Sequence, residues 1–194
     1  KEKENRVFKF ETFQGWDIVP STARLCLMNL FLHGIGDLKE TPEIKVEDSL
    51  IEIPNKKVKI VLANPPFGKS STYTITNDEK LAKQEAFILR EDFWTTTSNK
   101  QLCFVQHIIS MLEVGGRTAI VLPDNVLFEG GAGEVIRKKL LEETDLHTIL
   151  RLPTGIFYAN GVKCNVLFKE KKKTTKKHST REVWFFDYRT NIHH

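Results

Sequence analysis

Hydrophobic positions along the chain recur with two different periods. Short apolar runs rich in β-branched residues are typical of strands, and segments with an apolar residue every three or four positions are typical of helices. Strands are expected at 7–13, 44–46, 60–63, 118–122, 147–152, 165–168 and 183–188, and helices at 20–34, 102–112 and 135–141. Because the two kinds of segment alternate, we predict an α/β domain with a mainly parallel sheet and helices on both faces.

Some of these segments carry more specific expectations. The helix at 20–34 begins at Pro20 and is apolar on nearly every side, so we expect it to be well buried. The run Ile-Val-Leu-Ala at 60–63 predicts a strand that is buried in the sheet. Gly115 and Gly116 are expected to end the helix at 102–112, because glycine is common directly after a helix.

Two polar segments interrupt the pattern. Residues 68–97 form a long, mostly polar connection, which is usually a functional lid or a disordered segment, and residues 87–94 within it are expected to form a short ordered element. Residues 169–178 carry six lysines and one glutamate. Such a run is typical of a solvated hairpin tip, and the alternative is a patch that binds phosphate groups without reading their sequence.

Composition and charge narrow the class of protein. The 194 residues carry 29 basic and 25 acidic side chains, and the net charge of +4 permits nucleic-acid binding without indicating it. Residues 1–190 are expected to form one domain, and 191–194, which end in two histidines, could be the remnant of a purification tag. No apolar run has membrane-spanning length, and no signal peptide is visible. The three cysteines are widely spaced, which predicts buried, reduced thiols in a cytoplasmic protein and no metal site.

The residues with the clearest chemistry directly follow the strand at 60–63. Asn64-Pro65-Pro66-Phe67 must leave the sheet in a stiff turn, because two successive prolines fix their φ angles and cannot continue a strand. The turn presents an amide, a backbone carbonyl and an aromatic ring. Two acceptors and a stacking face are what an exocyclic amino group on a flat heterocycle needs. The alternative is an ordinary turn with a packed phenylalanine.

This tetrapeptide resembles motif IV of the amino-methyltransferases, which transfer a methyl group from S-adenosylmethionine (AdoMet) to a nitrogen atom. Phenylalanine at the fourth position is similar to the enzymes that methylate N6 of adenine in DNA. Tyrosine at that position is shared more widely, including with enzymes that methylate a protein glutamine.

The order of further short motifs resembles the modification subunit of type I restriction–modification systems. The resemblance covers nearly the whole chain, from about residue 10 to residue 168. The motifs are Gly15-Trp16-Asp17, Met28-Asn29-Leu30, His33-Gly34, Asp48-Ser49-Leu50, Asn64-Pro65-Pro66-Phe67-Gly68, Gln106-His107, Gly115-Gly116-Arg117, Leu122-Pro123-Asp124, Ile136-Arg137 and Leu152-Pro153-Thr154-Gly155-Ile156-Phe157.

The resemblance implies a Rossmann-like AdoMet-dependent methyltransferase fold that lacks its first strand and its glycine-rich AdoMet loop. Asp17 matches the acid that binds the ribose hydroxyls of AdoMet, with Trp16 and Ile18 beside the cofactor adenine, and a carboxylate can accept two hydroxyl hydrogen bonds. Asp48 and Ser49 match the next motif, whose acid faces the amino group of the cofactor. The alternatives are a charge ahead of a helix for Asp17 and an ordinary polar loop residue for Asp48.

The resemblance also implies how the substrate base is held. Phe157 matches a late aromatic residue that helps to hold a flipped adenine, so Phe67 and Phe157 are the expected stacking residues. A phenylalanine packed in a hairpin is the alternative for Phe157, and Tyr158 is a second candidate. Because Asp17, Asp48 and Asn64 each follow a predicted strand, all three are expected to line one crevice.

The implied activity is site-specific N6-adenine methylation of DNA, with Asn64, Pro65, Pro66 and Phe67 as the catalytic residues and no metal. The implied partners are double-stranded DNA, a specificity subunit, a restriction subunit and a second modification subunit. This fragment alone is expected to be inactive, because the glycine-rich loop is missing. The alternatives are an RNA or protein-glutamine methyltransferase and a non-catalytic, methyltransferase-like scaffold.

Overall fold

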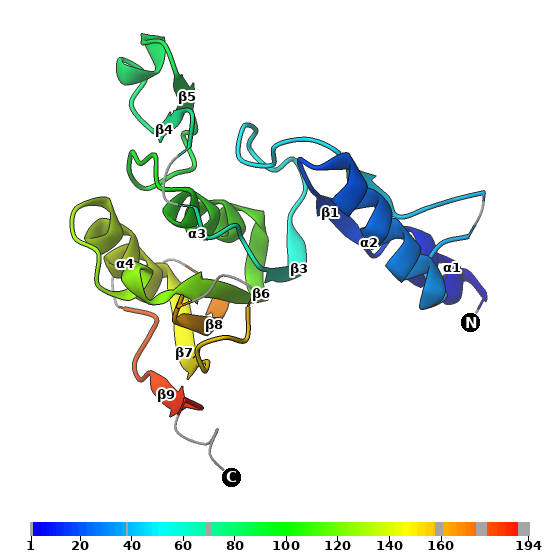
Figure 1. Ribbon diagram of the computed structural model, residues 1–194. Coiled ribbons are helices and arrows are strands. Elements are labelled where there is room, and N and C mark those ends of the chain that lie inside the picture. The colour runs from blue at the N-terminus through cyan, green and yellow to red at the C-terminus, as the bar shows by residue number, and fades with distance from the viewer. Residues whose placement is uncertain (1, 38, 69–70, 158–160, 174–177, 190–194) are drawn as a thin grey trace. The chain divides into compact units, whose positions relative to one another are not determined.

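The computed structural model describes residues 2–37, 39–68, 71–157, 161–173 and 178–189 (Figure 1). The chain divides into two compact units, which we call unit 1 (Lys1–Ile51) and unit 2 (Glu52–His194). The expectation of one domain over residues 1–190 stays a prediction, and residues 191–194 lie outside the described residues.

Unit 1 contains two helices and a two-stranded sheet. β1 runs parallel to β2, with Trp16 opposite Lys45. The two strands therefore bring their carboxyl ends to the same edge. The elements of unit 1 are α1 (Glu2–Phe10), β1 (Gln14–Trp16), α2 (Pro20–Leu32) and β2 (Glu43–Lys45).

The first strand begins later than predicted, and a strand over residues 7–13 is wrong. Residues up to Phe10 belong to α1, which carries acidic residues in its first turn and Lys9 in its last turn. This distribution of charge favours a helix, because it complements the helix dipole. The ring of Phe8 packs edge-on against that of Phe13, with centroids 5.5 Å apart. The apolar residues that suggested a strand thus serve a helix and the turn after it.

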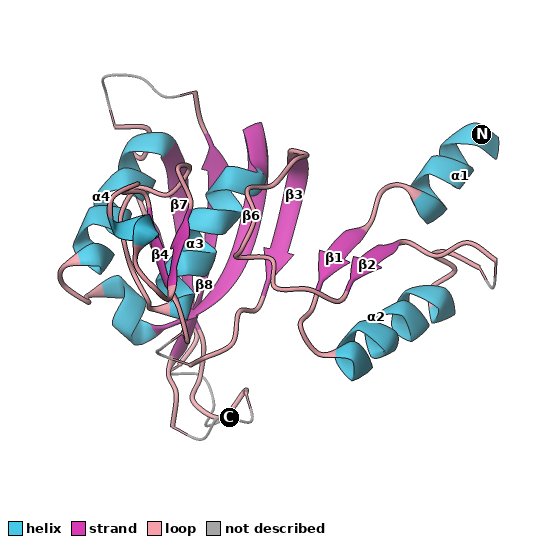
Figure 2. Cartoon of the chain, turned by 90° about the horizontal axis from the view of Figure 1, so that it is seen from above, coloured by secondary structure: helices cyan, strands magenta, loops and turns pink. Residues whose placement is uncertain are grey.

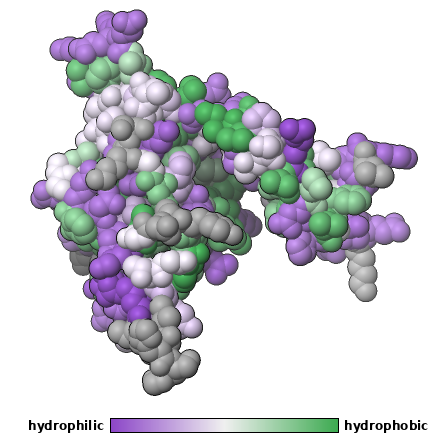
Figure 3. Space-filling model, viewed as in Figure 1, coloured by the Kyte–Doolittle hydropathy of each residue, from purple (hydrophilic) through white to green (hydrophobic). Residues whose placement is uncertain are grey.

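The helix predicted from Pro20 is confirmed as α2, but the expected burial of α2 is wrong. Ala23 is its one buried residue, whereas Leu25 and Met28 are 64% and 61% exposed. Hydrophobic side chains of unit 1 accordingly reach the surface (Figure 3). Two short strands offer too little area to cover a helix that is apolar on every side. Cys26 on α2 is likewise exposed, whereas Cys103 and Cys164 are buried as expected.

Unit 2 is built on a five-stranded sheet (Figure 2). Four of its strands point in one direction, and β8 alone runs antiparallel to its two neighbours, which confirms a mainly parallel sheet. In spatial order the strands are β3 (Val58–Ala63), β6 (Leu112–Pro123), β8 (Cys164–Lys171), β7 (Thr144–Arg151) and β9 (Trp184–Asp187).

Two helices, α3 (Lys100–Met111) and α4 (Ala132–Glu143), cover the same face of this sheet (Figure 2). Val105 of α3 and Ile136 of α4 share one buried cluster with Ile120 of β6. The predicted helices are therefore confirmed, and their apolar stripes form the core. Helices on the second face of the sheet stay a prediction, since the structure does not place α1 and α2 relative to unit 2.

The strand at 60–63 is confirmed as part of β3, but it is not buried. Val61 packs into the core, whereas Ile60 and Leu62 are 58% and 78% exposed. The reason is that β3 lies at one end of the described sheet, with β6 as its only neighbour there. Successive side chains of a strand point to opposite faces, and only one face is covered by α3 and α4.

Gly115 and Gly116 do not end a helix, contrary to the prediction. α3 ends at Met111, and both glycines lie inside β6. A Cβ atom on Gly116 would lie 3.0 Å from the carbonyl oxygen of Val58. The pairing of β3 with β6 is irregular at this point. Glycine is therefore needed for the close approach of two backbones, a role that glycine often has within a strand.

The polar connection contains short regular elements of its own. β4 (Thr74–Thr76) pairs in parallel with β5 (Phe87–Leu89), and a 3-10 turn, η1, spans Leu81–Lys83. The expected ordered element at 87–94 is confirmed as a strand over Phe87–Leu89. A second 3-10 turn, η2 (Asp124–Leu127), follows β6.

The lysine-rich run does not form a solvated tip where it begins. Lys169 and Lys171 lie in β8, and Lys169 is fully buried. The Lys171 ammonium donates to the carbonyl oxygens of Ile109 (2.7 Å) and Leu112 (3.0 Å). Neither a solvated tip nor a phosphate patch describes these two lysines, so both proposed roles are wrong for them. The long aliphatic stem of lysine allows the side chain to be accommodated within a sheet. Residues 174–177 lie outside the described residues.

Within the part of the chain that the structure describes, no helix has the length and hydrophobicity needed to cross a bilayer.

Candidate functional site

The carboxyl ends of four strands meet at one edge of the unit 2 sheet. β3, β6, β7 and β9 share a direction, so the residues that follow them emerge at the same edge. These residues include Asn64 after β3, Asp124 after β6 and Leu152 after β7. Open α/β sheets bind their ligands at this edge. The sequence-predicted substrate residues of unit 2 all follow one of these strands.

The turn after β3 exposes its amide and buries its first proline. Asn64 is exposed, Pro65 is buried and Phe67 is half-buried. Among the described residues, no side chain or backbone group hydrogen-bonds the Asn64 amide. The rings of Pro65 and Pro66 fix φ at two successive residues, which makes the turn stiff. The role of Asn64 and Pro65 as the two acceptors stays a prediction.

The two residues expected to stack on a base contact one another. The rings of Phe67 and Phe157 have centroids 5.6 Å apart and planes inclined by 80°. The structure thus joins residues 90 positions apart in sequence into one aromatic pair. Such edge-to-face pairs are favourable. Tyr158, the second candidate, lies outside the described residues.

The expected cofactor residues gather in unit 1, at the carboxyl edge of the β1–β2 pair. Asp17 follows β1, and its Oδ1 accepts a hydrogen bond from the Val19 N–H (2.7 Å). Its own N–H donates to the Lys45 carbonyl oxygen of β2 (3.0 Å). Trp16 is half-buried, and its indole N–H donates to Glu47 (3.2 Å), whereas Ile18 is 67% exposed.

Asp48 lies three residues beyond the end of β2. Its Oδ1 accepts a hydrogen bond from the Leu50 N–H (3.0 Å), and both Asp48 and Ser49 are half-buried. Asp17 and Asp48 therefore emerge from adjacent parallel strands. Because the units are not placed relative to one another, a single crevice shared by these acids and Asn64 stays a prediction.

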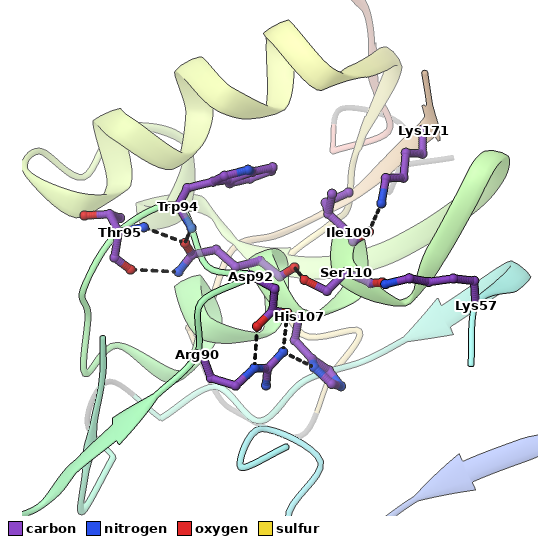
Figure 4. Close-up of polar contacts among 10 residues, drawn as sticks. Lys57, Arg90, Asp92, Trp94, Thr95, His107, Ile109, Ser110 and Lys171 are labelled. Carbon is purple, nitrogen blue, oxygen red and sulfur yellow. Dashed lines mark hydrogen bonds and ion pairs between the residues drawn. The ribbon is translucent and has the colours of Figure 1, made fainter. Parts of the chain in front are cut away.

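Sequence reasoning missed a buried ionic cluster that attaches the polar connection to α3 (Figure 4). Arg90 is fully buried and donates two 2.7 Å hydrogen bonds to the Asp92 carboxylate. The same guanidinium lies 3.2 Å from Nδ1 of His107 and stacks over the ring of Phe93. In the sequence this cluster shows only as an isolated arginine and the Gln106-His107 dipeptide. Neither feature reveals that the polar connection contacts α3.

Burial alone would raise the pKa of Asp92, yet the pKa is lowered. Hydrogen bonds from Arg90 and Ser110, with the charge of Arg90, outweigh the burial. Asp92 is therefore held as a carboxylate between the polar connection and α3. This contact fixes the connection whose residues the sequence assigned to a lid or a disordered segment.

Other polar groups of α3 are also bonded to neighbouring segments (Figure 4). The Gln106 side-chain oxygen accepts from the backbone N–H groups of Trp94 (2.8 Å) and Thr95 (3.1 Å). At the C-terminal end of α3, Lys57 donates to the Ser110 carbonyl oxygen and Lys171 donates to the Ile109 carbonyl oxygen. Cations at the last carbonyls of a helix stabilise it.

A second polar cluster joins the ends of three strands. We call it the strand-end cluster and define it as Asp124, Arg151 and Asn165. Oδ1 of Asp124 accepts a hydrogen bond from Nδ2 of Asn165 (2.6 Å), and its Oδ2 lies 3.6 Å from Nη2 of Arg151. Asn165 is fully buried. Asn165 Oδ1 and Arg151 Nε are buried without a hydrogen-bond partner among the described residues.

Lys169 is a buried cation within the described part of unit 2. Its ammonium nitrogen is buried and has no hydrogen-bond partner among the described residues. The hydroxyl of Thr118, which lies opposite Lys169 on β6, is also buried without a hydrogen-bond partner among them. Burial lowers the pKa of Lys169 to about 7.

Comparison with known proteins shows relatives along the whole chain. Residues 1–194 match the family described as N-6 DNA methylase. The chain is 48% identical over 189 residues to the methylase subunit of the type I restriction enzyme StySJI from Salmonella typhimurium LT2. It is also 48% identical over 189 residues to that of EcoKI from Escherichia coli K12. Each alignment covers 93% of this chain and 33% of the relative, so the chain spans about a third of these proteins.

Solved structures share this architecture. The crystal structure of the EcoKI M protein (EC 2.1.1.72) matches with a TM-score of 0.80 and 44% identity, over 98% of this chain and 38% of that one. The type I methyltransferase subunit from Streptococcus thermophilus matches with a TM-score of 0.69 and 28% identity, over 91% of this chain and 36% of that one. A Listeria monocytogenes protein assigned to the class I AdoMet-dependent methyltransferases matches with a TM-score of 0.58 at 18% identity. The fold is therefore that of AdoMet-dependent methyltransferases.

Proposed function

Because the chain belongs to the N-6 DNA methylase family, we propose that it forms the adenine-holding part of a DNA methyltransferase that modifies adenine N6. One observation carries this proposal: an exposed asparagine follows a strand at the carboxyl edge of a mainly parallel sheet, three residues before one ring of an aromatic pair. Asn64, Phe67 and Phe157 supply that arrangement. Acceptors and stacking faces are the groups by which a flipped adenine is recognised.

The residues of the turn act on the amino group of the base. The Asn64 side-chain oxygen and the Pro65 carbonyl oxygen accept the two N6 hydrogens. These bonds draw the nitrogen towards tetrahedral geometry and concentrate its lone pair. They also stabilise the positive charge that develops on nitrogen when it is methylated, which is electrostatic preorganisation. The aromatic rings hold the base in the orientation for attack.

The residues of unit 1 fit the groups of AdoMet. Two carboxylates, Asp17 and Asp48, emerge from adjacent strands, and carboxylates are suited to ribose hydroxyls and to an amino group. Trp16 and Ile18 provide apolar surface beside Asp17 for a flat ring. When bound, AdoMet supplies an electrophilic methyl group. Asp17, Trp16, Ile18, Asp48 and Ser49 are the residues of this chain that would hold it.

The relatives' names suggest the partners of the whole protein. They are methylase subunits of type I restriction enzymes, so we propose that the full-length protein acts on double-stranded DNA. A specificity subunit would select the site, and a second modification subunit and a restriction subunit would complete the assembly. Their presence can be tested by co-purification with the tagged full-length protein.

The function is tested by replacing Asn64 with alanine in the full-length protein, assembled with its specificity subunit. Methyl transfer to double-stranded DNA should fall by about 10²- to 10³-fold, because a transition-state contact is removed. Asn55→Ala is the matched control, since Asn55 is also exposed but precedes β3 at the opposite end of the strand. Undiminished transfer by Asn64→Ala would overturn the mechanism. Transfer to RNA or to a protein glutamine instead of DNA would overturn the substrate.

A further inference from the structure

We propose that the strand-end cluster of Asp124, Arg151 and Asn165 positions Phe157 for the substrate base. The inference rests on the proposed function, because Phe157 matters only if a base is held there. It concerns residues that the mechanism above does not use. Each member acts through Phe157, so they are positioning residues.

The cluster fixes three strands to one another at the substrate edge. Asp124 follows β6, Arg151 ends β7 and Asn165 lies at the start of β8. The Asp124 carboxylate is bonded to Asn165 and paired with Arg151, so one side chain bridges all three strands. Two backbone bonds reinforce it: the Asp124 N–H donates to the Lys163 carbonyl (2.9 Å) and the Leu152 N–H to that of Cys164 (2.9 Å).

The loop that carries Phe157 begins at this cluster. Arg151 is the last residue of β7, and Phe157 follows six residues later. Gly155, midway along, has φ of +90°, a backbone conformation that glycine adopts readily. A loop that turns at a glycine needs a fixed origin if its tip is to be placed reproducibly. The ion pair at Arg151 supplies that origin.

The tip of the loop has to move when a base is bound. Phe67 and Phe157 touch edge to face, with their planes inclined by 80°. A base stacked between two parallel rings needs them about 7 Å apart, which is two contact distances. Phe157 must therefore turn and retreat while β6, β7 and β8 stay in place. The strand-end cluster lies where the moving loop joins the fixed strands.

The cluster is also incompletely hydrogen-bonded in the described structure. A buried acceptor, Asn165 Oδ1, and a buried donor, Arg151 Nε, have no partner among the described residues. Buried polar groups are nearly always paired in native proteins. An unpaired donor and acceptor at the origin of the loop can bond its backbone groups when the loop adopts the base-bound position.

The test uses the full-length protein, assembled with its specificity subunit, and a DNA substrate. Asp124→Asn keeps an oxygen for Asn165 and removes the charge facing Arg151. Arg151→Met removes the partner charge, and Arg151→Lys retains it. We expect Asp124→Asn and Arg151→Met to lower kcat about 10-fold with KM for DNA within about 3-fold, since misplacing a reacting group by about 1 Å can cost up to about 10²-fold. Arg151→Lys should stay within about 3-fold of the parent.

A double variant separates positioning from a general structural defect. If Asp124 acts through Phe157, Asp124→Asn should have no further effect on kcat in a Phe157→Ala background. Multiplied losses in the double variant would overturn the inference. With 2-aminopurine at the target adenine, Asp124→Asn should change the fluorescence of the bound DNA in the same direction as Phe157→Ala. No change, or an opposite change, would also overturn it.

A carboxylate outside the strand-end cluster provides the control. Glu142→Gln removes a carboxylate that is paired with Lys139 (3.1 Å) on α4, and it should leave kcat unchanged. If the parent complex does not methylate adenine in DNA, the proposed function itself fails. If the parent is active and both Asp124→Asn and Arg151→Met match its kcat, only the present inference fails. Should Arg151→Met not fold, the isosteric Asp124→Asn decides the outcome.

Discussion

Each unit joins an arginine to a carboxylate, and the two pairs differ in their surroundings. In unit 2, Arg90 is completely buried and Asp92 is 19% exposed. In unit 1, Arg6 and Glu40 are 63% and 47% exposed, although the pair is also close, at 3.1 Å. An exposed pair contributes little to stability, whereas breaking a buried pair leaves a charge without compensation.

The contrast extends to the groups that carry the proposed chemistry. Asn64 and the Phe67–Phe157 pair are attached to a sheet with a packed core and with hydrogen-bonded polar contacts beneath it. Asp17 and Asp48 are attached to two short strands beside a helix with one buried residue, Ala23. We infer that unit 2 preorganises Asn64 and Phe67 through its own packing. Unit 1 has few buried contacts by which to preorganise the cofactor residues.

Arg90→Met should have the largest effect on this contrast. The free energy of unfolding should fall by about 3–5 kcal/mol, because Asp92 loses its charged partner in a half-buried place. The pKa of Asp92 is lowered in the folded state, so the stabilisation is present above its ordinary value of 3.8 and lost as the pH falls through the folded pKa. Hydrogen exchange of α3 amides in the full-length protein measures the change. A loss under about 1 kcal/mol would show that burial does not distinguish the two pairs.

Lys169→Met should increase stability, with an effect that depends on pH. The pKa of Lys169 is lowered to about 7 from 10.5, so the unfolded state binds more protons between these values and stability rises with pH there. Below pH 7, burying the charged Lys169 lowers the free energy of unfolding by about 5 kcal/mol. Repacking around methionine lowers it by about 1–2 kcal/mol in the variant, so the gain is smaller than the full 5. We expect a net gain of about 3 kcal/mol at pH 6, vanishing near pH 10.

Lys171→Met is the matched control for that experiment. Lys171 is two residues away in β8, but its ammonium group donates to the carbonyl oxygens at the end of α3. Its removal should destabilise the protein by about 1–3 kcal/mol, because buried carbonyls lose a charged donor. Chemical denaturation at pH 6 and pH 10 compares the two variants. If both variants changed the free energy of unfolding in the same direction, the structural distinction between Lys169 and Lys171 would be contradicted.

Asp17→Asn tests the cofactor side of the comparison. AdoMet affinity should fall about 10-fold or more, since a hydrogen bond to a charged group contributes about 1.5–3 kcal/mol. The rate at saturating AdoMet should change much less, whereas Asn64→Ala should remove turnover and leave AdoMet binding intact. Calorimetric titration and single-turnover kinetics on the assembled enzyme separate the two. Unchanged affinity in Asp17→Asn would assign Asp17 to the entry of α2 alone.

Arg6→Met should have the smallest effect. Loss of the exposed pair with Glu40 should lower the free energy of unfolding by at most about 1 kcal/mol, and high salt should remove the difference. Chemical denaturation with and without 1 M salt provides the measurement. A loss as large as that of Arg90→Met would mean that unit 1 is held together by its surface charges.

Much of unit 2 followed from the spacing of its apolar residues. α3, α4 and the strands at 118–122 and 165–168 were predictable because each buries one clear stripe or face. The burial of β3 could not be predicted. An apolar run of this kind is compatible with a strand that is covered on one face and with a strand that is covered on both. The apolar stretch near Phe10 was likewise ambiguous: its charges favour a helix, while its aromatic residues favour a strand.

The candidate site divides in the same way. Asn64 and Phe67 lie three residues apart in one stiff turn, so their proximity along the chain could be predicted from the sequence alone. Phe157 was predicted by resemblance, and its contact with Phe67 depends on the strand order. The partnership of Arg90 with His107, and the assembly of Asp124 with Asn165, arise from tertiary packing. Charge and spacing along the chain carry no signal for such pairs.

Under the proposed function, the contact between Phe67 and Phe157 also has a consequence for which bases the site admits. The two rings compete with any incoming base for each other's surface. An edge-to-face pair contributes about 0.5–1.5 kcal/mol, so opening it lowers the apparent affinity of every base by about 2- to 12-fold. A purine has the larger ring face and offsets more of this loss by stacking than a pyrimidine does. Under the proposed function, the pair would therefore favour larger rings before any hydrogen bond to Asn64 forms.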